Sequence, residues 1–303
     1  MPIILYIDLI LMSKFKNITI HRPKSQPLTL EQFSFFLAGL IDADGHINKL
    51  GNVIITFHSR DISVAYYIKT RIGYGRVSKH IQKNAITYVC SHPIGKQSIC
   101  QYIYQKLINP DRIEQLNIRL VPFLKRLAFL NAQKQSKGLK KQRRFKTQSD
   151  KSRAKATPMM NQPGPAMLSL QNHWLAGFIQ GDGSFQVKLV SKNNRLLTKK
   201  EVRLVLQIDL KQLSILKQLQ NLIGGSIGYR ASQNTYYYNS VSFQRAAKLI
   251  QYLDHFQVMG SSITLYWMWR KCYIMIQNKH HLSQKGINDI AKIKAQMSKL
   301  RLN

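Results

Sequence analysis

The sequence predicts an α+β protein made of two similar halves, and three observations lead to this prediction. A nine-residue segment at 37–45 recurs in altered form at 175–183. Each copy closes a helical pattern and precedes segments in which apolar and polar residues alternate, as in strands with one buried face. With 303 residues, the chain can hold two domains of ordinary size. We therefore expect two pseudo-symmetric αββαββα subdomains.

The repeated segment reads LAGLIDADG at 37–45 and LAGFIQGDG at 175–183. The copies lie much further apart than the repeats of a solenoid, which indicates a duplicated domain. A stretch rich in Lys and Arg, with prolines and a glycine, separates them and cannot form a packed core. The expected organisation is an N-terminal extension over residues 1–28, a first subdomain over 29–132, a basic linker over 133–167 and a second subdomain over 168–303.

Each copy of the segment ends a predicted helix. Thr29 and Gln32 fit a capping box at the start of the first helix, and Gly45 suits its end. Ser169 is the expected cap of the second helix. The alternating residues that follow predict hairpins, and the first hairpin of the second copy is longer because of extra residues around 191–195.

Small residues four positions apart lie on one face of each helix, so the two helices can pack closely. They are Gly39 and Ala43 in the first copy, and Gly177 and Gly181 in the second. This packing places Asp44 and Asp182 side by side at two helix C-termini, where like charges repel and both macrodipoles are negative. A divalent cation, Mg²⁺ or Mn²⁺, would stabilise such a pair and could activate water for phosphodiester cleavage.

The repetition distinguishes Asp44 and Asp182 from the other acidic residue of the motif. A single copy would be consistent with a surface aspartate at the end of a helix, whereas two copies favour a shared site. Asp42 is not part of the pair, because its counterpart in the second copy is Gln180.

The charge balance indicates a polyanionic partner. The chain has 46 Lys and Arg against 13 Asp and Glu, a formal net charge of +33, which favours nucleic acid without separating DNA from RNA. Its 3 cysteines have no metal-binding spacing and are odd in number, which argues against a zinc finger or a disulfide framework. The apolar stretch 1–12 is too short to span a bilayer, so we expect no membrane partner. An interfacial anchor and a transit peptide are the alternative interpretations of this stretch.

The two motifs, the strand pattern after each and the closing segment 279–297 resemble the LAGLIDADG homing endonucleases, in their single-chain form encoded by organellar introns. The resemblance covers most of residues 30–300. It implies a monomer in which the two motif helices pack at the centre of a β-saddle over double-stranded DNA. It also implies that Asp44 and Asp182 are the catalytic, metal-binding residues, with the carbonyls of Ala43 and Gly181 as further ligands. A mitochondrial location is expected, with the chloroplast as the alternative.

Every second side chain of the saddle strands should reach base edges in the major groove. The alternation assigns His46, Asn48, Asn52, Thr56, Arg76, Ser78 and His80 in the first copy, and Ser184, Gln186, Lys188, Arg203, Gln207, Arg230, Tyr236, Tyr238, Ser240 and Ser242 in the second. The register of the second hairpins is open, and the three tyrosines at 236–238 could shift by one position. Because the copies differ at nearly all of these positions, we expect a long, asymmetric target.

The chain departs from the family in one respect. Related enzymes often place a lysine after the second hairpin, but residues 259–265 contain no basic residue. Lys106, Arg112 and Lys125 are the candidates in the first copy, and the sequence does not choose among them. The resulting hypothesis is a site-specific, metal-dependent double-strand DNA endonuclease that promotes intron homing. The alternatives are an RNA maturase that assists splicing of its host intron, in addition or instead, and a DNA-binding protein without activity.

Overall fold

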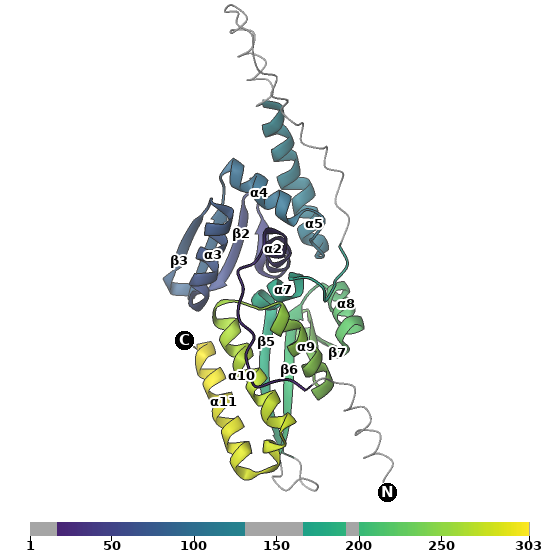
Figure 1. Cartoon of the computed structure of the whole chain (residues 1–303). Helices are drawn as coiled ribbons and strands as arrows, with labels where there is room; N and C mark the ends of the chain where they lie inside the picture. The colour runs from purple at the N-terminus through teal and green to yellow at the C-terminus, as the bar shows by residue number, and fades with distance from the viewer. Residues whose placement is uncertain (1–16, 131–165, 192–199, 303) are drawn as a thin grey trace, which may run out of the picture.

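The computed structural model describes residues 17–130, 166–191 and 200–302, and it contains the two expected halves (Figure 1). Each half has the order helix, two strands, helix, two strands, helix, so the predicted α+β architecture with two αββαββα units is confirmed. Most of the basic linker and the tip of the long hairpin lie outside the described residues.

The first half begins with its motif helix and continues through four strands. Its elements are α2 (Leu30–Asp44), β1 (Gly45–Ile47), β2 (Val53–His58), α3 (Ile62–Ile72), β3 (Arg76–His80), β4 (Ala85–Cys90), α4 (Pro93–Ile103) and α5 (Pro110–Gln115). The helical path after α5 continues to residue 130.

The second half repeats this order and ends in two long helices. Its elements are α7 (Trp174–Asp182), β5 (Gly183–Ser191), β6 (Lys200–Leu210), α8 (Leu213–Ile223), β7 (Ser226–Arg230), β8 (Thr235–Ser240), α9 (Phe243–His255), α10 (Gly260–Gln277) and α11 (Gln284–Leu302). Strands β5 and β6 have 9 and 11 residues, against 3 and 6 in β1 and β2, so the first hairpin of this half reaches further, as expected.

The two sheets are antiparallel and have the same topology, β1-β2-β4-β3 and β5-β6-β8-β7. One face of each sheet is packed against helices, α3 in the first half and α8, α9 and α10 in the second. Equivalent buried side chains pair across strands on this face, Ile55 with Tyr88 and Ile208 with Tyr238. The opposite face of each sheet therefore remains for contacts with a partner.

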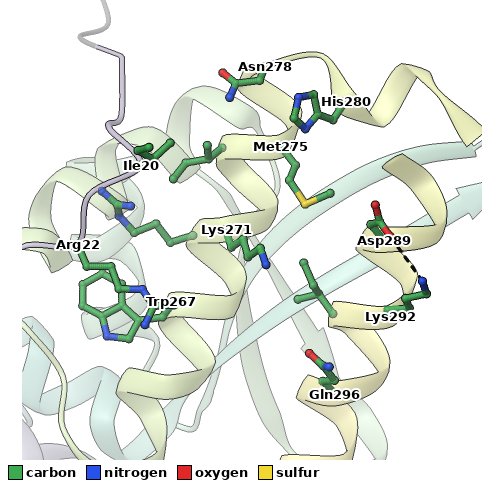
Figure 2. A pocket seen from close by; sticks show the side chains of 13 residues that line it. Ile20, Arg22, Trp267, Lys271, Met275, Asn278, His280, Asp289, Lys292 and Gln296 are labelled. Atoms are coloured by element: carbon green, nitrogen blue, oxygen red, sulfur yellow. Dashed lines mark ion pairs between the residues drawn. The ribbon is translucent and has the colours of Figure 1, made fainter. Parts of the chain in front are cut away.

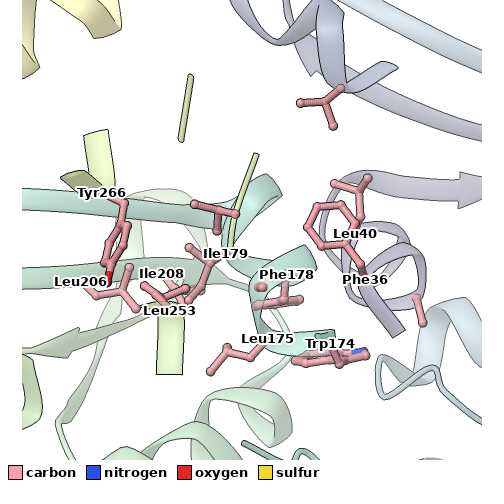
Figure 3. Packing of buried hydrophobic residues seen from close by; sticks show 14 of the residues in the cluster. Phe36, Leu40, Trp174, Leu175, Phe178, Ile179, Leu206, Ile208, Leu253 and Tyr266 are labelled. Carbon is pink, nitrogen blue, oxygen red and sulfur yellow. The ribbon is translucent and has the colours of Figure 1, made fainter. Parts of the chain in front are cut away.

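The two halves meet where α2 crosses α7. Aromatic and aliphatic side chains from both helices are fully buried at this contact, among them Phe36 and Leu40 of α2 and Trp174 and Phe178 of α7 (Figure 3). They join one hydrophobic cluster that extends into both sheets, including Leu206 and Ile208 of β6, so the two halves share a core.

The start of α2 agrees with the prediction, whereas the start of α7 does not. The Thr29 side chain accepts a hydrogen bond from the Gln32 amide (3.3 Å), and the Gln32 side chain accepts one from the Thr29 amide (2.9 Å), which confirms the capping box. Ser169 is not a cap, because α7 begins only at Trp174. The Asn172 side chain accepts from the Trp174 amide instead (2.9 Å), so the motif helix of this half is shorter than predicted.

Both motif helices end at a glycine, because a side chain at that position would not fit against the preceding turn. Gly45 has an extended backbone (φ −90°), so each helix passes straight into a strand without the left-handed turn of a Schellman cap. A Cβ on Gly45 would lie 2.6 Å from the Cα of Ile41, and one on Gly183 would lie 2.6 Å from the carbonyl oxygen of Ile179. The final glycine of each motif is thus required by close packing against the preceding turn.

The described part of the N-terminal extension, residues 17–28, contacts the second half before the chain enters α2. The Ile18 amide donates to the Gln277 side chain (3.0 Å), and the Gln277 side chain donates back to the Ile18 carbonyl (3.0 Å). Arg270 donates to the carbonyl of His21 (3.2 Å). Among the described residues, no helix combines the length and the apolar character needed to cross a bilayer.

Candidate active site

The close approach of the motif helices depends on two glycines. A Cβ on Gly39 would lie 1.9 Å from the Trp174 carbonyl oxygen, and a Cβ on Gly177 would lie 1.9 Å from the Phe36 carbonyl oxygen. These reciprocal distances leave no room for any side chain, so the backbones touch at the crossing. Further along, a Cβ on Gly181 would lie 2.6 Å from the Ala43 Cβ. The four small residues of the two motifs therefore face each other.

This crossing brings together the carboxylates at the two helix ends. Asp44 borders the solvent, whereas Asp182 is half-buried. A Cβ on Gly181 would lie 2.9 Å from Asp44 Oδ2, which places the Asp44 carboxylate against the last turn of α7. Asp182 Oδ2 is buried and has no hydrogen-bond donor among the described residues. A buried carboxylate oxygen without a partner needs a proton or a cation.

The proton affinities of both carboxyl groups reflect this arrangement. Desolvation raises the pKa of Asp44 to about 6, against the opposing effect of Arg112. Desolvation also raises the pKa of Asp182, and the negative charges of Asp44 and Asp209 raise it further, to about 8, although Arg112 acts against them. The two groups thus repel each other when both are ionised, which is the charge pattern that a divalent cation stabilises.

Arg112, in α5, is the one of the three candidate basic residues that acts on these carboxylates. Its positive charge lowers the pKa of both Asp44 and Asp182, and its buried Nε has no acceptor in the described part of the chain. Lys106 instead lies 5.4 Å from the ring centroid of Phe35, in the middle of α2. Lys125 is exposed on the helical stretch that follows α5.

Asp42 belongs to the same motif as Asp44, but it is buried and hydrogen-bonded within the protein. Its Oδ2 accepts hydrogen bonds from the Ile108 amide (2.7 Å) and from Trp174 Nε1 of the other half (2.9 Å), and the side chain is fully buried. Burial raises its pKa to about 7. Its counterpart Gln180 accepts from the Met259 amide (2.8 Å). This position therefore ties each motif helix to the segment just before the next helix, α5 in the first half and α10 in the second.

The first sheet presents most of the predicted DNA-contacting residues on one face. The pairing of Ser78 with Thr87, and of Thr87 with Thr56, puts these three side chains in one row across the sheet. His46, Arg76 and His80 lie on the same face by the same register. Sequence reasoning missed the members contributed by β4 and by the rest of β2, which are Ile54, His58, Ala85, Thr87 and Val89.

Two predicted residues of the first half lie in the turn between β1 and β2. The Asn48 side chain accepts hydrogen bonds from the Leu50 amide (3.0 Å) and the Asn52 amide (2.9 Å). The side-chain oxygen of Asn48 therefore stabilises the turn. Asn52 stands just before β2, so both asparagines are at the end of the hairpin and not within the sheet face.

A chain of side-chain contacts follows the equivalent face of the second sheet. Gln186 donates to Gln207 (3.0 Å), and Gln207 donates to Asp209 (2.9 Å). Asp209 forms an ion pair with Arg230 (3.1 Å), whose guanidinium lies 5.0 Å from the ring centroid of Tyr237. Ser184, Lys188 and Arg203 share this face. The contacts order the polar side chains before any partner binds.

The predicted register of β8 is wrong by one residue. Tyr238 and Ser240 are fully buried on the core face, and Tyr236 pairs with Leu210 on that same face. Ser242 caps α9 by accepting from the Arg245 amide (3.2 Å). The exposed face instead carries Thr235, Tyr237 and Asn239.

A comparison of the two halves contains the signal that fixes this register. The Tyr88 hydroxyl donates to the Tyr74 carbonyl (2.7 Å), and the Tyr238 hydroxyl donates to the Gly224 carbonyl (2.7 Å). Each tyrosine comes four residues after an asparagine, so an alignment of NAITY at 84–88 with NTYYY at 234–238 would have assigned Tyr238 to the core.

The ligand set for a cation is small. Among the described residues, no group of three or more His, Cys, Asp or Glu side chains could hold a metal ion. The two aspartates are therefore the charged ligands available at the helix ends, and backbone carbonyls, water or phosphate oxygens would have to complete the coordination of a hard cation.

Comparisons with known proteins agree with this geometry. A family model described as LAGLIDADG endonuclease matches residues 175–273. The uncharacterized cox1 intron-2 37.2 kDa protein of Schizosaccharomyces pombe is 38% identical over 280 residues, which cover 91% of this chain and 76% of that protein. A probable intron-encoded endonuclease 3 of Neurospora crassa is 28% identical over 131 residues, which cover 42% of this chain and 25% of that protein.

Solved structures share the fold. I-SmaMI bound to an uncleaved DNA target in the presence of calcium ions has a TM-score of 0.65 and 23% identity, with 90% of this chain and 99% of that chain covered. I-LtrWI bound to target DNA has a TM-score of 0.62 and 19% identity, with 88% and 97% covered. With the family model, the S. pombe relative and both motifs in agreement, the chain belongs to the LAGLIDADG endonuclease family.

Proposed function

We propose that this chain is a site-specific, divalent-metal-dependent endonuclease that cuts both strands of a long, asymmetric DNA site and so promotes intron homing. The observation that carries the proposal is the carboxylate pair at the ends of α2 and α7, with a buried Asp182 oxygen that has no donor among the described residues. Because each half supplies one carboxylate, a single chain completes the site, and we propose a monomer.

Asp44 and Asp182 would hold the cation, Mg²⁺ or Mn²⁺, with the carbonyls of Ala43 and Gly181 as additional oxygen ligands. Such an ion lowers the pKa of a bound water and neutralises charge on the reacting phosphate. Arg112 favours the ionised form of both carboxylates, since its charge lowers the pKa of each. Of the three candidate basic residues, Arg112 is also the one whose charge acts on the carboxylates at the helix ends. Its guanidinium would suit binding of a phosphate oxygen there.

The two polar sheet faces would read the DNA on either side of the cut. They differ in the equivalent row across the sheet. The row Thr56, Thr87 and Ser78 of the first sheet is neutral, whereas the row Asp209, Tyr237 and Gly228 of the second contains an acid that is paired with Arg230. Different faces favour different base sequences, which supports an asymmetric target. The solved relatives bound to DNA targets support double-stranded DNA as the partner. The cox1 intron relative supports a mitochondrial origin.

The test is cleavage of DNA that carries intron-free insertion sites, with Mg²⁺ and with a chelator in its place. The proposal predicts breaks at one defined position in both strands, only with the metal. Cutting that continues with the chelator, or breaks without a defined position, would contradict it.

A second function, binding of the host intron RNA, is favoured by a basic groove of about 660 Å³ on the second half (Figure 2). Arg22, Trp267 and Lys271 line it, with α11 on its other side. Arg22 lies 5.5 Å from the ring centroid of Trp267. Arg22 and Lys271 form no ion pair with any described carboxylate, so their charges are available for phosphates.

The groove is separate from the carboxylate pair. Helix α10 packs through Tyr266 and Trp269 against Phe185 on the core side of the second sheet, and the groove opens on the outer side of that helix. RNA bound there would not compete with DNA on the saddle. The double variant Arg22→Glu, Lys271→Glu should lose affinity for the intron transcript and keep DNA cleavage. RNA affinity equal to that of the wild type would exclude the groove.

A further inference from the structure

A short turn of the first half contacts the ends of two helices of the second half. This turn, Ser59–Asp61, follows β2 directly. The buried Asp61 carboxylate accepts hydrogen bonds from the Ser261 amide (2.7 Å) and the Ser261 hydroxyl (3.0 Å). Helix α10 lacks a side-chain cap of its own, because Met259 occupies its N-cap position. Asp61 therefore caps α10 from the other half, where a negative charge also suits the helix macrodipole.

The neighbouring residue binds the far end of α11. Arg60 donates to the carbonyls of Leu300 (3.2 Å) and Arg301 (2.9 Å), in the last turn of that helix. Its Nε also donates to the Ser261 hydroxyl (3.1 Å). Two adjacent residues of the first half thus satisfy the N-terminus of α10 and the C-terminus of α11 at the same time.

The contact is shaped for a close fit. Gly260 has a positive φ of 55°, and a Cβ there would lie 2.5 Å from Asp61 Oδ1. A larger residue would displace the carboxylate from the helix end. On the opposite side of the central helices, Gln212 of the second half donates to the exposed Asp111 at the start of α5. Figure 1 places α3 and α10 on one side of α2 and α7, and α5 and α8 on the other.

The difference between the two sides matters because the central crossing can act as a pivot. The backbones of α2 and α7 touch at Gly39 and Gly177, close to the axis about which one half could rotate on the other, so contacts there act against such a rotation with only a short lever arm. A contact away from that axis restrains the rotation. The buried, charged contact of Arg60 and Asp61 restrains it more strongly than the exposed contact of Gln212 and Asp111.

We propose that Arg60 and Asp61 form an interdomain clasp that fixes the angle between the two sheets and thereby sets the spacing that the enzyme accepts between the two halves of its target. They are positioning residues, because they act through the placement of the sheets. The part of this inference that concerns DNA rests on the proposed function, whereas the part that concerns the angle does not.

The angle can be measured in the free protein by the distance between two spin labels. Lys83→Cys and Gln233→Cys place labels on the exposed turns of the second hairpins, and the native Cys90, Cys100 and Cys272 are buried. We expect a single narrow distance distribution for this labelled protein and a broader or shifted one after Asp61→Ala. Asp61→Asn, which keeps an acceptor for the Ser261 amide, should restore most of the narrow distribution. An unchanged distribution in Asp61→Ala would overturn the proposal.

Two controls separate the clasp from general loss of stability. Ile290→Val removes one methylene from the core of α11 and should leave the distance unchanged. Asp111→Ala removes the weaker contact on the other side and should change it less than Asp61→Ala. If Asp61→Ala does not fold, Ser261→Ala takes its place, because it removes only the hydroxyl shared by Arg60 and Asp61.

The effect on DNA is measured as the ratio of affinities for the target and for the same target with one base pair inserted at its centre, in Ca²⁺. Asp61→Ala should reduce this ratio by about tenfold, the factor expected for a lost charge-assisted hydrogen bond. A ratio equal to that of the wild type would contradict the clasp. If the wild-type protein recognises no target, the proposed function fails, and the spin-label distances still decide the clasp.

Discussion

The two motif aspartates share one nearby cation, Arg112, but only the aspartate of the second half also has acids that raise its pKa. Arg112 opposes the rise in the pKa of Asp44, which reaches about 6, while Asp44 and Asp209 add to the desolvation of Asp182, whose pKa reaches about 8. Ser262 and its neighbours at the start of α10 supply no basic residue. The duplication has kept the helix crossing and the carboxylates, but the surrounding charges have diverged, so the two carboxylates differ in proton affinity.

Removal of either carboxylate should have the largest effect on activity. Asp44→Asn and Asp182→Asn keep the size of the side chain and remove the charge that would hold the cation. We expect each variant to lower double-strand cutting by about 10³-fold. Asp209→Asn, on the polar face of the second sheet, is the control and should retain cutting within about tenfold. Activity of either motif variant close to that of the control would refute the pairing.

The helix crossing should be the most sensitive part of the scaffold. Gly177→Ala places a Cβ 1.9 Å from the Phe36 carbonyl oxygen, and we expect a loss of about 3 kcal/mol or more in the free energy of unfolding. Gly73→Ala is the control for loss of a glycine in open space, because a Cβ there meets no atom within 4 Å; the positive φ of Gly73 (78°) means that the change should still cost about 1 kcal/mol. Urea denaturation compares the two. Equal losses would show that the crossing tolerates side chains.

Arg112 offers a way to sharpen the difference between the halves. Arg112→Ala removes the charge that lowers the pKa of both carboxyl groups, so we expect about 10²-fold slower cutting and an activity profile shifted to higher pH. Arg112→Lys should recover part of the rate. Lys125→Ala is the control for loss of a positive charge elsewhere. A pH profile of Arg112→Ala that coincides with that of the wild type would show that Arg112 does not act on the carboxylates.

The raised pKa values also predict how stability depends on pH in metal-free protein. Both aspartates bind protons more tightly in the folded state than at the ordinary pKa of 3.8, so this contribution to stability is present at low pH and is lost between about pH 4 and pH 8. Thermal unfolding at pH 5 and pH 8 should therefore differ less in Asp182→Asn than in the wild type. An equal or larger difference in the variant would contradict the predicted pH dependence of stability.

The smallest predicted effect concerns the hydrogen bond that joins the halves beside the site. Trp174→Phe keeps the aromatic packing and removes the donor to Asp42, and the Ile108 amide remains as a partner. We expect a loss of about 1 kcal/mol in stability and little change in cutting. Stability equal to that of the wild type would leave this bond without a role in joining the halves.

Local patterns in the sequence predicted the parts of the molecule that depend on neighbouring residues. The capping box at Thr29, the duplication and the longer first hairpin of the second half follow from spacing alone. The small residues at 39 and 177 indicated close helix packing because a helix repeats its face every few residues. Ser169 failed as a cap because its helix starts later, at Trp174, where Asn172 accepts the hydrogen bond.

The rest depends on contacts between distant segments. The register of β8 is set by Tyr238, whose hydroxyl bonds to Gly224, and three consecutive tyrosines give no alternation from which to read it. Arg112 could not be chosen over Lys106 from the sequence, because the choice depends on their places in the fold. Arg112 acts on Asp44 at the end of α2, whereas Lys106 lies against Phe35 in the middle of that helix. The clasp of Asp61 with Ser261 joins residues that are 200 positions apart.

The central claim is that the two halves share one metal site, and Mn²⁺ binding to the full-length protein tests it most directly. Electron paramagnetic resonance measures free Mn²⁺ in the presence of the wild type, Asp44→Asn and Asp182→Asn. The account predicts tighter binding at pH 8 than at pH 6, because the carboxylates must lose their protons, and at least about tenfold weaker binding in each single variant. Wild-type affinity in either variant would contradict a site shared between Asp44 and Asp182.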